Sequence, residues 1–259
     1  MDIAKLDIEE IKKNFRIKFD YHTHTVYSRV GPYLHGKGRI IDNARAAAER
    51  GLEALAITDH GPSDFYGLSI KRIPQMRRDI ASAKFAFPKL KILLGVEADI
   101  VDTPNGIDVK PADIEKFDFI NAGYHYVPKC HMISNWLAFH LPYPADAREK
   151  LRRQNTARIV KALKSNDINI LTHPGDKAFI DEHAVAKACE ETGTLVEINA
   201  RHKHPDADDL RIYKQYDVSF VISSDAHQPK HVGRYVESLA LAMEAGIDPE
   251  RIVNIIKRA

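Results

Sequence analysis

Cysteine is scarce in this chain of 259 residues: Cys130 and Cys189 are the only two, and they form no C-x-x-C pair. Two isolated cysteines argue against a disulfide framework and favour free thiols in a reducing compartment. An excess of one charge is also lacking, because 38 lysines and arginines stand against 36 aspartates and glutamates, a formal charge of +2. Such a chain has no overall field that attracts nucleic acid or acidic lipid, although a local basic patch is left open.

Long apolar runs are absent as well. The stretch MDIAKLDIEEIKKNF, residues 1–15, interrupts its apolar residues with charges, which argues against a signal peptide, and no segment reaches the length of a membrane span. No Pro/Gly/Ser-rich linker, low-complexity tract or solenoid repeat divides the chain. We therefore expect one cytoplasmic domain over residues 1–259, with 1–16 as an N-terminal helical extension.

Short apolar runs, in contrast, recur along the chain, each rich in Ile, Val, Leu or Phe. Runs of this length and composition are typical of strands buried on both faces of a sheet. Helical patterns lie between most of them, and the alternation of strand and helix predicts a parallel sheet. We predict an α/β fold, a distorted seven-stranded (β/α)7 TIM-like barrel. The predicted strands are 17–22, 52–60, 90–98, 117–125, 168–173, 194–199 and 218–227.

Helix 40–51 has Asp42 as a plausible N-cap and Gly51 as its end, and helix 146–166 carries one apolar face. Segment 124–146 departs from the alternation, because it contains three prolines, the only tryptophan and several other aromatic residues. We interpret it as a long loop that either packs over one end of the barrel or covers a substrate as a lid. Further helices are predicted at 181–193, 207–217, 236–246 and 248–259.

Histidine is abundant, with thirteen in the chain. The first two lie in YHTHTVYS, residues 21–28, where His22 and His24 share a face if the segment is extended. This spacing alone fits a polar turn as well as a metal site, since H-x-H is a weak pattern. The other predicted strands favour the metal site, because six of the seven end at or next to a histidine or a carboxylate and the seventh contains a glutamate.

These side chains are expected to meet at the C-terminal face of the barrel. In a parallel barrel the carboxyl ends of all strands open onto that face, where active sites are built. Histidine and carboxylate ligands without cysteine favour zinc first, with manganese or iron as substitutes. Six or more such ligands exceed what one tetrahedral ion holds, so the count predicts a metal cluster bridged by a carboxylate. The residues concerned are His22, His24, Asp59, His60, Glu97, His125, His173, Glu197, Asn199, Asp225 and His227.

With these motifs in view, the sequence resembles the PHP family, named after its polymerase and histidinol-phosphatase members, from about residue 18 to 235. The resemblance rests on H-x-H, T-D-H, G-[IV]-E, H-P and D-x-H motifs and on two further histidines. It implies a distorted seven-stranded barrel with up to three metal ions, and the hydrolysis of phosphoesters. The short chain is similar to the free-standing phosphatases of the family. The implied metal positions are His22, His24, His35, His60, Glu97, His125, His173, Asp225 and His227.

The resemblance also implies how these ligands divide among three divalent ions. Asp59 is implied to orient a ligand imidazole rather than to bind a metal. Asp225, His227 and Glu97 are the predicted catalytic residues. The first ion would be held by His22, His24, Glu97 and Asp225, the second by Glu97, His125 and His173, and the third by His35, His60 and His227.

The chemistry that this implies is metal-assisted hydrolysis of a small phosphate monoester. A water between two ions would have its pKa lowered and would attack phosphorus, while cations neutralise the phosphoryl oxygens. No G-x-S-x-G or catalytic-cysteine pattern points to a protein nucleophile instead. Arg201 and Lys177 are the candidate substrate contacts, although each fits a surface charge equally well, and Arg29 and Lys37 are weaker candidates.

Several alternatives stay open. The same cluster would serve a histidinol-phosphate phosphatase, an exonuclease on single-stranded nucleic acid ends, or a non-catalytic metal-stabilised module. The near-neutral charge argues against the exonuclease. An amide-hydrolysing barrel also uses H-x-H but usually adds a bridging lysine, and no strand end offers one here. His202 and His204 match no ligand position and are interpreted as rim residues. No membrane partner is expected, and the sequence leaves the oligomeric state open.

Overall fold

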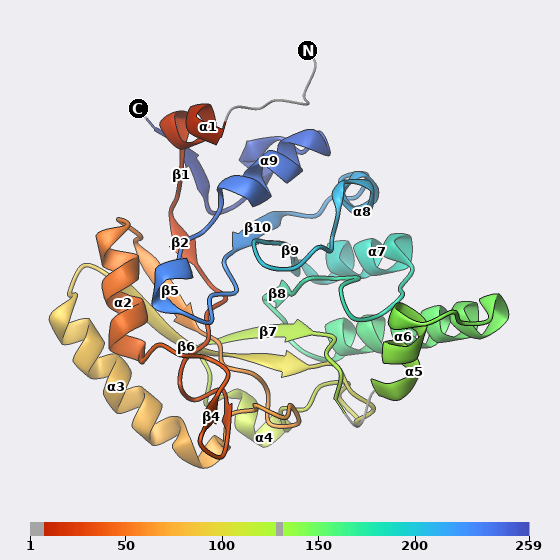
Figure 1. Ribbon diagram of the computed structural model, residues 1–259, viewed down its shortest axis with the longest axis horizontal. Coiled ribbons are helices and arrows are strands. Elements are labelled where there is room, and N and C mark those ends of the chain that lie inside the picture. The colour runs from red at the N-terminus through yellow and green to blue at the C-terminus, as the bar shows by residue number, and fades with distance from the viewer. Residues whose placement is uncertain (1–7, 128–131, 259) are drawn as a thin grey trace.

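The computed structural model describes residues 8–127 and 132–258, and its centre is a sheet of parallel strands curled nearly into a barrel (Figure 1). Each strand of this sheet lies beside the next one along the chain, so that the carboxyl ends all point to the same face. The predicted fold is confirmed. The strands are β2 (Phe19–Asp20), β5 (Ala54–Ile57), β6 (Lys91–Asp99), β7 (Phe119–Gly123), β8 (Ile170–Leu171), β9 (Leu195–Asn199) and β10 (Phe220–Ser223).

Helices cover the outside of the barrel. On one side α2 (Ile40–Glu49) packs with α3 (Ile73–Ala86) beside β5 and β6, and on the other α6 (Ala145–Ser165) packs with α7 (Glu182–Thr192) (Figure 1). As predicted, α7 is followed by a glycine, Gly193, at φ 70°. The short α4 (Pro111–Ile114), α8 (Ala207–Tyr213) and α9 (Val236–Glu244) complete the outer layer. None of the described helices combines the length and apolar character needed to cross a membrane.

Two predicted details of the helices and loops are wrong. Arg39, not Asp42, is the N-cap of α2, and Asp42 is the third helical residue, whose carboxylate accepts a hydrogen bond from the Arg39 N–H at 3.2 Å. Segment 124–146 is not one long loop, because α5 (Met132–His140) forms within it and α6 begins at Ala145. Residues 128–131, which include Cys130, lie outside the described residues. Whether the segment closes as a lid stays a prediction.

The chain ends also differ from the prediction. The segment 248–259 is not a helix, because it forms a 3₁₀ turn at Pro249–Arg251 and then β11 (Ile255–Lys257). This strand pairs antiparallel with β1 (Phe15–Ile17), which follows α1 (Ile8–Asn14). Burial of Ile255 and Phe15 in the same apolar core favours this pairing over a helix. Of the predicted helical extension 1–16, residues 8–14 are helical and residues 15–16 belong to β1, while residues 1–7 lie outside the described residues.

Side chains join the first and last strands of the barrel, β2 and β10. Along this seam the backbone contact is a single bridge, Thr23–Ala226, with the His24 N–H donating to the Ala226 carbonyl at 2.9 Å. The buried Asn254 side chain spans the same seam by donating to the carbonyls of Phe19 (2.8 Å) and Ile222 (2.7 Å). It also accepts from the Ile222 N–H at 3.0 Å. The buried Asp20 carboxylate of β2 crosses the seam as well, by accepting from the Ser224 N–H at 3.2 Å. The closure of the barrel therefore depends on buried polar side chains, among them Asn254.

Asn254→Ala is expected to lower the free energy of unfolding by about 3 kcal/mol, because it leaves buried backbone groups on both strands without partners. Urea unfolding followed by circular dichroism would measure this loss. The neighbouring Val253, which is 42% exposed, offers a matched control in Val253→Ala, for which we expect little change. A shift of Asn254→Ala no larger than that of the control would contradict the role of Asn254 at the seam.

Candidate metal centre

Four of the predicted ligands occupy the same position relative to a strand. His22, His125, His173 and Asp225 are each the second residue after β2, β7, β8 and β10. Because the parallel strands end at a common face, these side chains reach one layer above the barrel. His173 and Asp225 have φ values of 29° and 47°, which residues with a Cβ rarely adopt. Backbone strain of this kind concentrates at functional sites.

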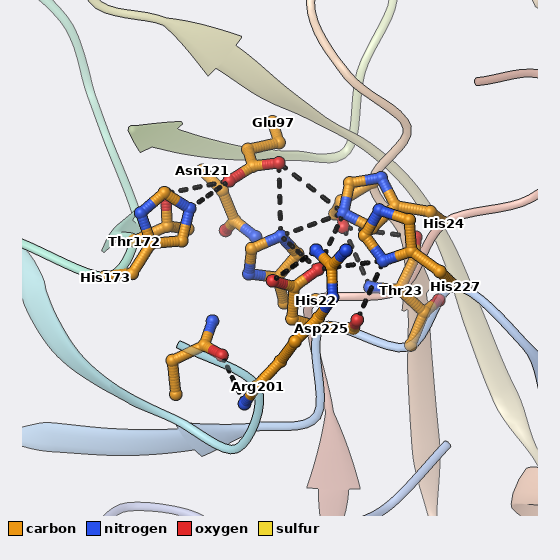
Figure 2. A network of polar contacts seen from close by, with 12 residues as sticks. His22, Thr23, His24, Glu97, Asn121, Thr172, His173, Arg201, Asp225 and His227 are labelled. Carbon is orange, nitrogen blue, oxygen red and sulfur yellow. Dashed lines mark hydrogen bonds and ion pairs between the residues drawn. The ribbon is translucent and has the colours of Figure 1, made fainter. Parts of the chain in front are cut away.

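Glu97, on β6, is the centre of the cluster and is fully buried. Its two carboxylate oxygens face different sets of imidazoles, as expected of a carboxylate that bridges two ions (Figure 2). Thr172 also donates its hydroxyl to Glu97 Oε1, at 3.0 Å. From Glu97 Oε2 the distances are 3.2 Å to His22 Nε2, 3.5 Å to His24 Nε2 and 3.1 Å to His60 Nδ1; from Oε1 they are 3.0 Å to His173 Nε2 and 3.3 Å to His125 Nε2.

A second carboxylate, Asp225, faces the same group of rings (Figure 2). Its Oδ1 atom lies 3.2 Å from both His24 Nε2 and His227 Nδ1. His35 closes the cluster on its outer side, since its ring centroid lies 4.4 Å from that of His227 and 5.3 Å from that of His60. The structure thus brings all nine implied metal positions together.

The residues present fit divalent cations. Sets of ligand atoms within 4.8 Å of one another include His22/His24/Asp225, Glu97/His125/His173 and His24/His60/His227. Several of these buried atoms make no hydrogen bond, a costly arrangement that a bound cation would relieve. Nitrogen and carboxylate donors without thiolate are the set that zinc, manganese and iron accept. The buried side-chain atoms of the cluster without a hydrogen-bond partner are His24 Nδ1, His60 Nδ1, Glu97 Oε2, His173 Nδ1, Asp225 Oδ1 and His227 Nε2.

The pKa values of the cluster shift in both directions, because the carboxylates raise the pKa of His22 and of His125 against the effect of burial. Burial raises the pKa of Glu97, but the charges of His22 and His125 outweigh it and hold the pKa well below its ordinary value. Burial, together with His227 and His60, lowers the pKa of His24 well below its ordinary value and that of His35 to about 3. At neutral pH the glutamate is therefore anionic and these two imidazoles are neutral, the forms that bind metal.

Two further acids orient ligand imidazoles through their second nitrogen. Glu197 Oε1 accepts from His22 Nδ1 at 2.7 Å, and Asp99 Oδ1 lies 2.7 Å from His125 Nδ1. Such contacts fix the ring and its tautomer. Glu197 was expected among the strand-end residues at the barrel face but matched no implied metal position, and Asp99 was not predicted. The available clue was spacing, because Asp99 lies two residues after Glu97 on β6 and so shares its face.

Asp59 does not orient a ligand imidazole, as the resemblance implied, but binds backbone and hydroxyl groups. Its buried carboxylate accepts hydrogen bonds from the backbone and hydroxyl of Thr25 (both 2.7 Å) and of Ser28 (3.0 and 2.6 Å). Ser28 Oγ in turn accepts from the His60 N–H at 3.2 Å. Asp59 therefore holds the loop next to His24 and the backbone of His60, rather than an imidazole ring.

Asp59→Ala is expected to lower the free energy of unfolding by about 3 kcal/mol, because four donors around the buried carboxylate lose their acceptor. Burial raises the pKa of Asp59, against the hydrogen bonds of Ser28 and Thr25, so the neutral isostere in Asp59→Asn is expected to cost much less. Thermal and urea unfolding of both variants would measure the difference. Equal losses for alanine and asparagine would contradict the hydrogen-bonding role.

A cavity of about 520 Å³ opens above the cluster. Both predicted substrate contacts, Lys177 and Arg201, line it. Arg201 points toward Asp225 (Figure 2), and its Nη1 lies 3.5 Å from Asp225 Oδ2. Lys177 forms an ion pair with Asp176. The weaker candidates Arg29 and Lys37 are not among the described residues that line this cavity.

The structure places His202 inside the cluster rather than at its rim. His202 Nε2 lies 3.0 Å from Asp225 Oδ2, and its Nδ1 lies 2.9 Å from Asp176 Oδ2. His204 does lie apart from the cluster, where its Nδ1 bonds to Asp209 at 2.8 Å. Asp64 was missed by the sequence analysis; it lines the cavity, and its ligand atom lies within 4.8 Å of those of His60 and His125.

Comparison with known proteins places the chain in a family. Residues 20–203 match the PHP domain, so the chain belongs to the PHP domain family, as predicted. It is similar to a probable phosphatase of Thermoanaerobacter sp. (strain X514), with 29% identity over 254 residues covering 92% of this chain and 91% of that protein. A probable phosphatase of Shewanella amazonensis is 27% identical over 250 residues, covering 91% and 86%.

A solved structure shares the fold. It is the histidinol phosphate phosphatase of Lactococcus lactis subsp. lactis, complexed with zinc, L-histidinol and phosphate. Its TM-score against this chain is 0.63 at 18% sequence identity, and the match covers 89% of this chain and 94% of that one.

Proposed function

We propose that this chain is a metal-dependent phosphatase that hydrolyses small phosphate monoesters at a cluster of three divalent ions. The predicted enzyme class, a hydrolase, agrees with the PHP family and with relatives named as probable phosphatases. The observation that carries the proposal is the Glu97 carboxylate, whose two oxygens face separate groups of imidazoles inside one buried cluster. In the proposed assignment, zinc is the first choice and manganese or iron are substitutes.

Each group of residues has its own role in the proposed hydrolysis. Bound divalent ions would supply Lewis acidity and an activated water. Glu97 and Asp225 would anchor the cluster, while Glu197 and Asp99 hold ligand rings in place through bonds of 2.7 Å. Arg201, with a side chain that is 44% exposed, and Lys177 would bind the phosphoryl oxygens from the cavity wall, where charge develops during the transfer.

The cavity favours a small ester over a nucleic acid chain as the substrate. Its volume of about 520 Å³ is in the range of small-molecule sites. Histidinol phosphate is one candidate, because the Lactococcus lactis neighbour was solved with L-histidinol and phosphate. An exonuclease and a non-catalytic module stay the alternative functions. The cytoplasmic location stays a prediction.

A metal and substrate survey tests the proposal. Purified protein is loaded with zinc or manganese, its metal content is measured, and phosphate release is followed with p-nitrophenyl phosphate, histidinol phosphate and a 5′-labelled oligonucleotide. We expect three ions per chain and release of phosphate from the monoesters. Shortening of the oligonucleotide at comparable efficiency would favour the nuclease, and bound metal with neither activity would favour the module.

A further inference from the structure

The cavity above the metal centre has two unlike walls. One wall carries Lys177, Arg201 and His202, next to Asp225. The other wall is apolar and mostly aromatic; it is formed by Phe65, Tyr66, Tyr126, Ile133 and Trp136. The apolar residues come from the loop after β5 and, much later in the sequence, from the segment after β7 and from α5. We call this second surface the aromatic wall.

The aromatic wall leaves large apolar side chains open to water. Trp136 is 46% exposed, Phe65 59% and Ile133 67%. Single exposed apolar residues are common on protein surfaces, but several that converge on one cavity mark a binding surface. Of the nine exposed large hydrophobic residues among those described, these three line the cavity over the metal centre.

Two rings of the wall are held in defined orientations. Tyr66 stacks on His35, with ring centroids 4.3 Å apart and an interplanar angle of 5°. Trp136 packs against His140, one turn further along α5, at 4.9 Å. Rings that are fixed in this way present flat faces at little cost in side-chain freedom. Flat faces of this kind suit a planar ligand better than a branched aliphatic one.

We propose that the natural substrate is a phosphate monoester whose alcohol carries an uncharged aromatic ring, and that Trp136 and Phe65 bind this ring. The inference rests on the proposed function, which puts the phosphate at the metal centre. With the phosphate held there by Arg201 and Lys177, the rest of the ester extends into the cavity. Lys177 and Arg201 line the same cavity, and Lys177 Nζ lies 5.9 Å from the ring centre of Tyr126, so a ring that is itself positively charged is disfavoured.

A matched pair of esters tests this inference. Benzyl phosphate and cyclohexylmethyl phosphate have similar size and similarly basic leaving groups, and they differ mainly in aromaticity. For the metal-loaded protein we expect kcat/KM to favour benzyl phosphate about five- to tenfold. This preference should fall to about one in Trp136→Ala and Phe65→Ala through a rise in KM, and Trp136→Phe should restore it. Phe85→Ala serves as a control, because Phe85 is 91% exposed and lies outside the cavity.

The outcomes separate the inference from the function on which it rests. Hydrolysis of both esters without preference, or a preference that survives Trp136→Ala and Phe65→Ala, would overturn the aromatic substrate class while the phosphatase activity stands. If neither ester releases phosphate from metal-loaded protein, the proposed function fails and this inference fails with it. A preference that is also lost in Phe85→Ala would overturn the assignment to the aromatic wall.

Discussion

Glu97→Gln is expected to abolish phosphate release and to lower the number of metal ions bound per chain. Glutamine keeps the shape of the side chain but can present only one oxygen, whereas both oxygens of Glu97 face imidazoles within 3.5 Å. Whichever way the amide turns, one of the two groups of histidines meets an NH2 group that cannot bind a metal. Loss of this bridge removes several kcal/mol of charge stabilisation, which corresponds to at least about 10³-fold in rate.

Phosphate release from p-nitrophenyl phosphate, together with metal analysis of the same samples, would measure both effects. Glu115→Gln is a matched control, because Glu115 is exposed at the end of α4 and is not one of the implied metal positions. We expect this control to change neither the rate of phosphate release nor the number of bound ions. A Glu97→Gln protein with a full metal complement and a rate within tenfold of the original chain would refute the bridging role. Circular dichroism would confirm that the variant is folded.

His173→Ala is the second substitution with a large expected effect, again a loss of turnover with little loss of fold. The ring is buried, and its Nε2 lies 3.0 Å from Glu97 Oε1, where the proposed second ion binds. If the proposed ion activates the attacking water, removing one of the residues that would hold it is expected to cost on the order of 10² or more in rate. Most of the hydrophobic core lies below this layer, so unfolding should change little.

His183→Ala is the matched histidine control, because His183 is exposed on α7 and contacts Tyr216 instead of the cluster. Phosphate release and urea unfolding of the two variants would be compared side by side. An unchanged rate in His173→Ala would remove His173 from the ligand set. Equal losses of activity in both histidine variants would show that the effect is not specific to the site.

Much of the candidate metal centre could be predicted from sequence because the candidate ligands follow strand ends in a parallel barrel. His125 and His173 illustrate this, since each directly follows an apolar run and each occupies the second position after its strand. His202 could not be placed in the same way. It lies three residues after β9, in a loop where Asn199 Oδ1 accepts hydrogen bonds from the backbone N–H groups of Arg201 (2.7 Å) and His202 (3.0 Å). Such local turns leave little trace in hydrophobic periodicity.

The parts of the fold that were mispredicted have physical reasons of the same kind. In α3, which the sequence analysis did not place, Ile73, Met76, Ile80 and Ala83 form a narrow buried stripe among charged residues, too sparse to stand out. At the C-terminus, the segment 248–259 has helix-like apolar spacing. Its actual conformation is decided by long-range pairing of β11 with β1 and by the buried amide of Asn254, neither of which a local pattern contains.

The seam between β2 and β10 gives the proposed metal ions a further role. His22 and His24 directly follow the strand on one side of it, and Asp225 and His227 follow the strand on the other. These two pairs are about 200 residues apart in the chain, so the unfolded polypeptide rarely brings them together. Ions shared by both pairs would act as a clasp that cross-links the beginning of the barrel to its end, much as a disulfide does in proteins richer in cysteine.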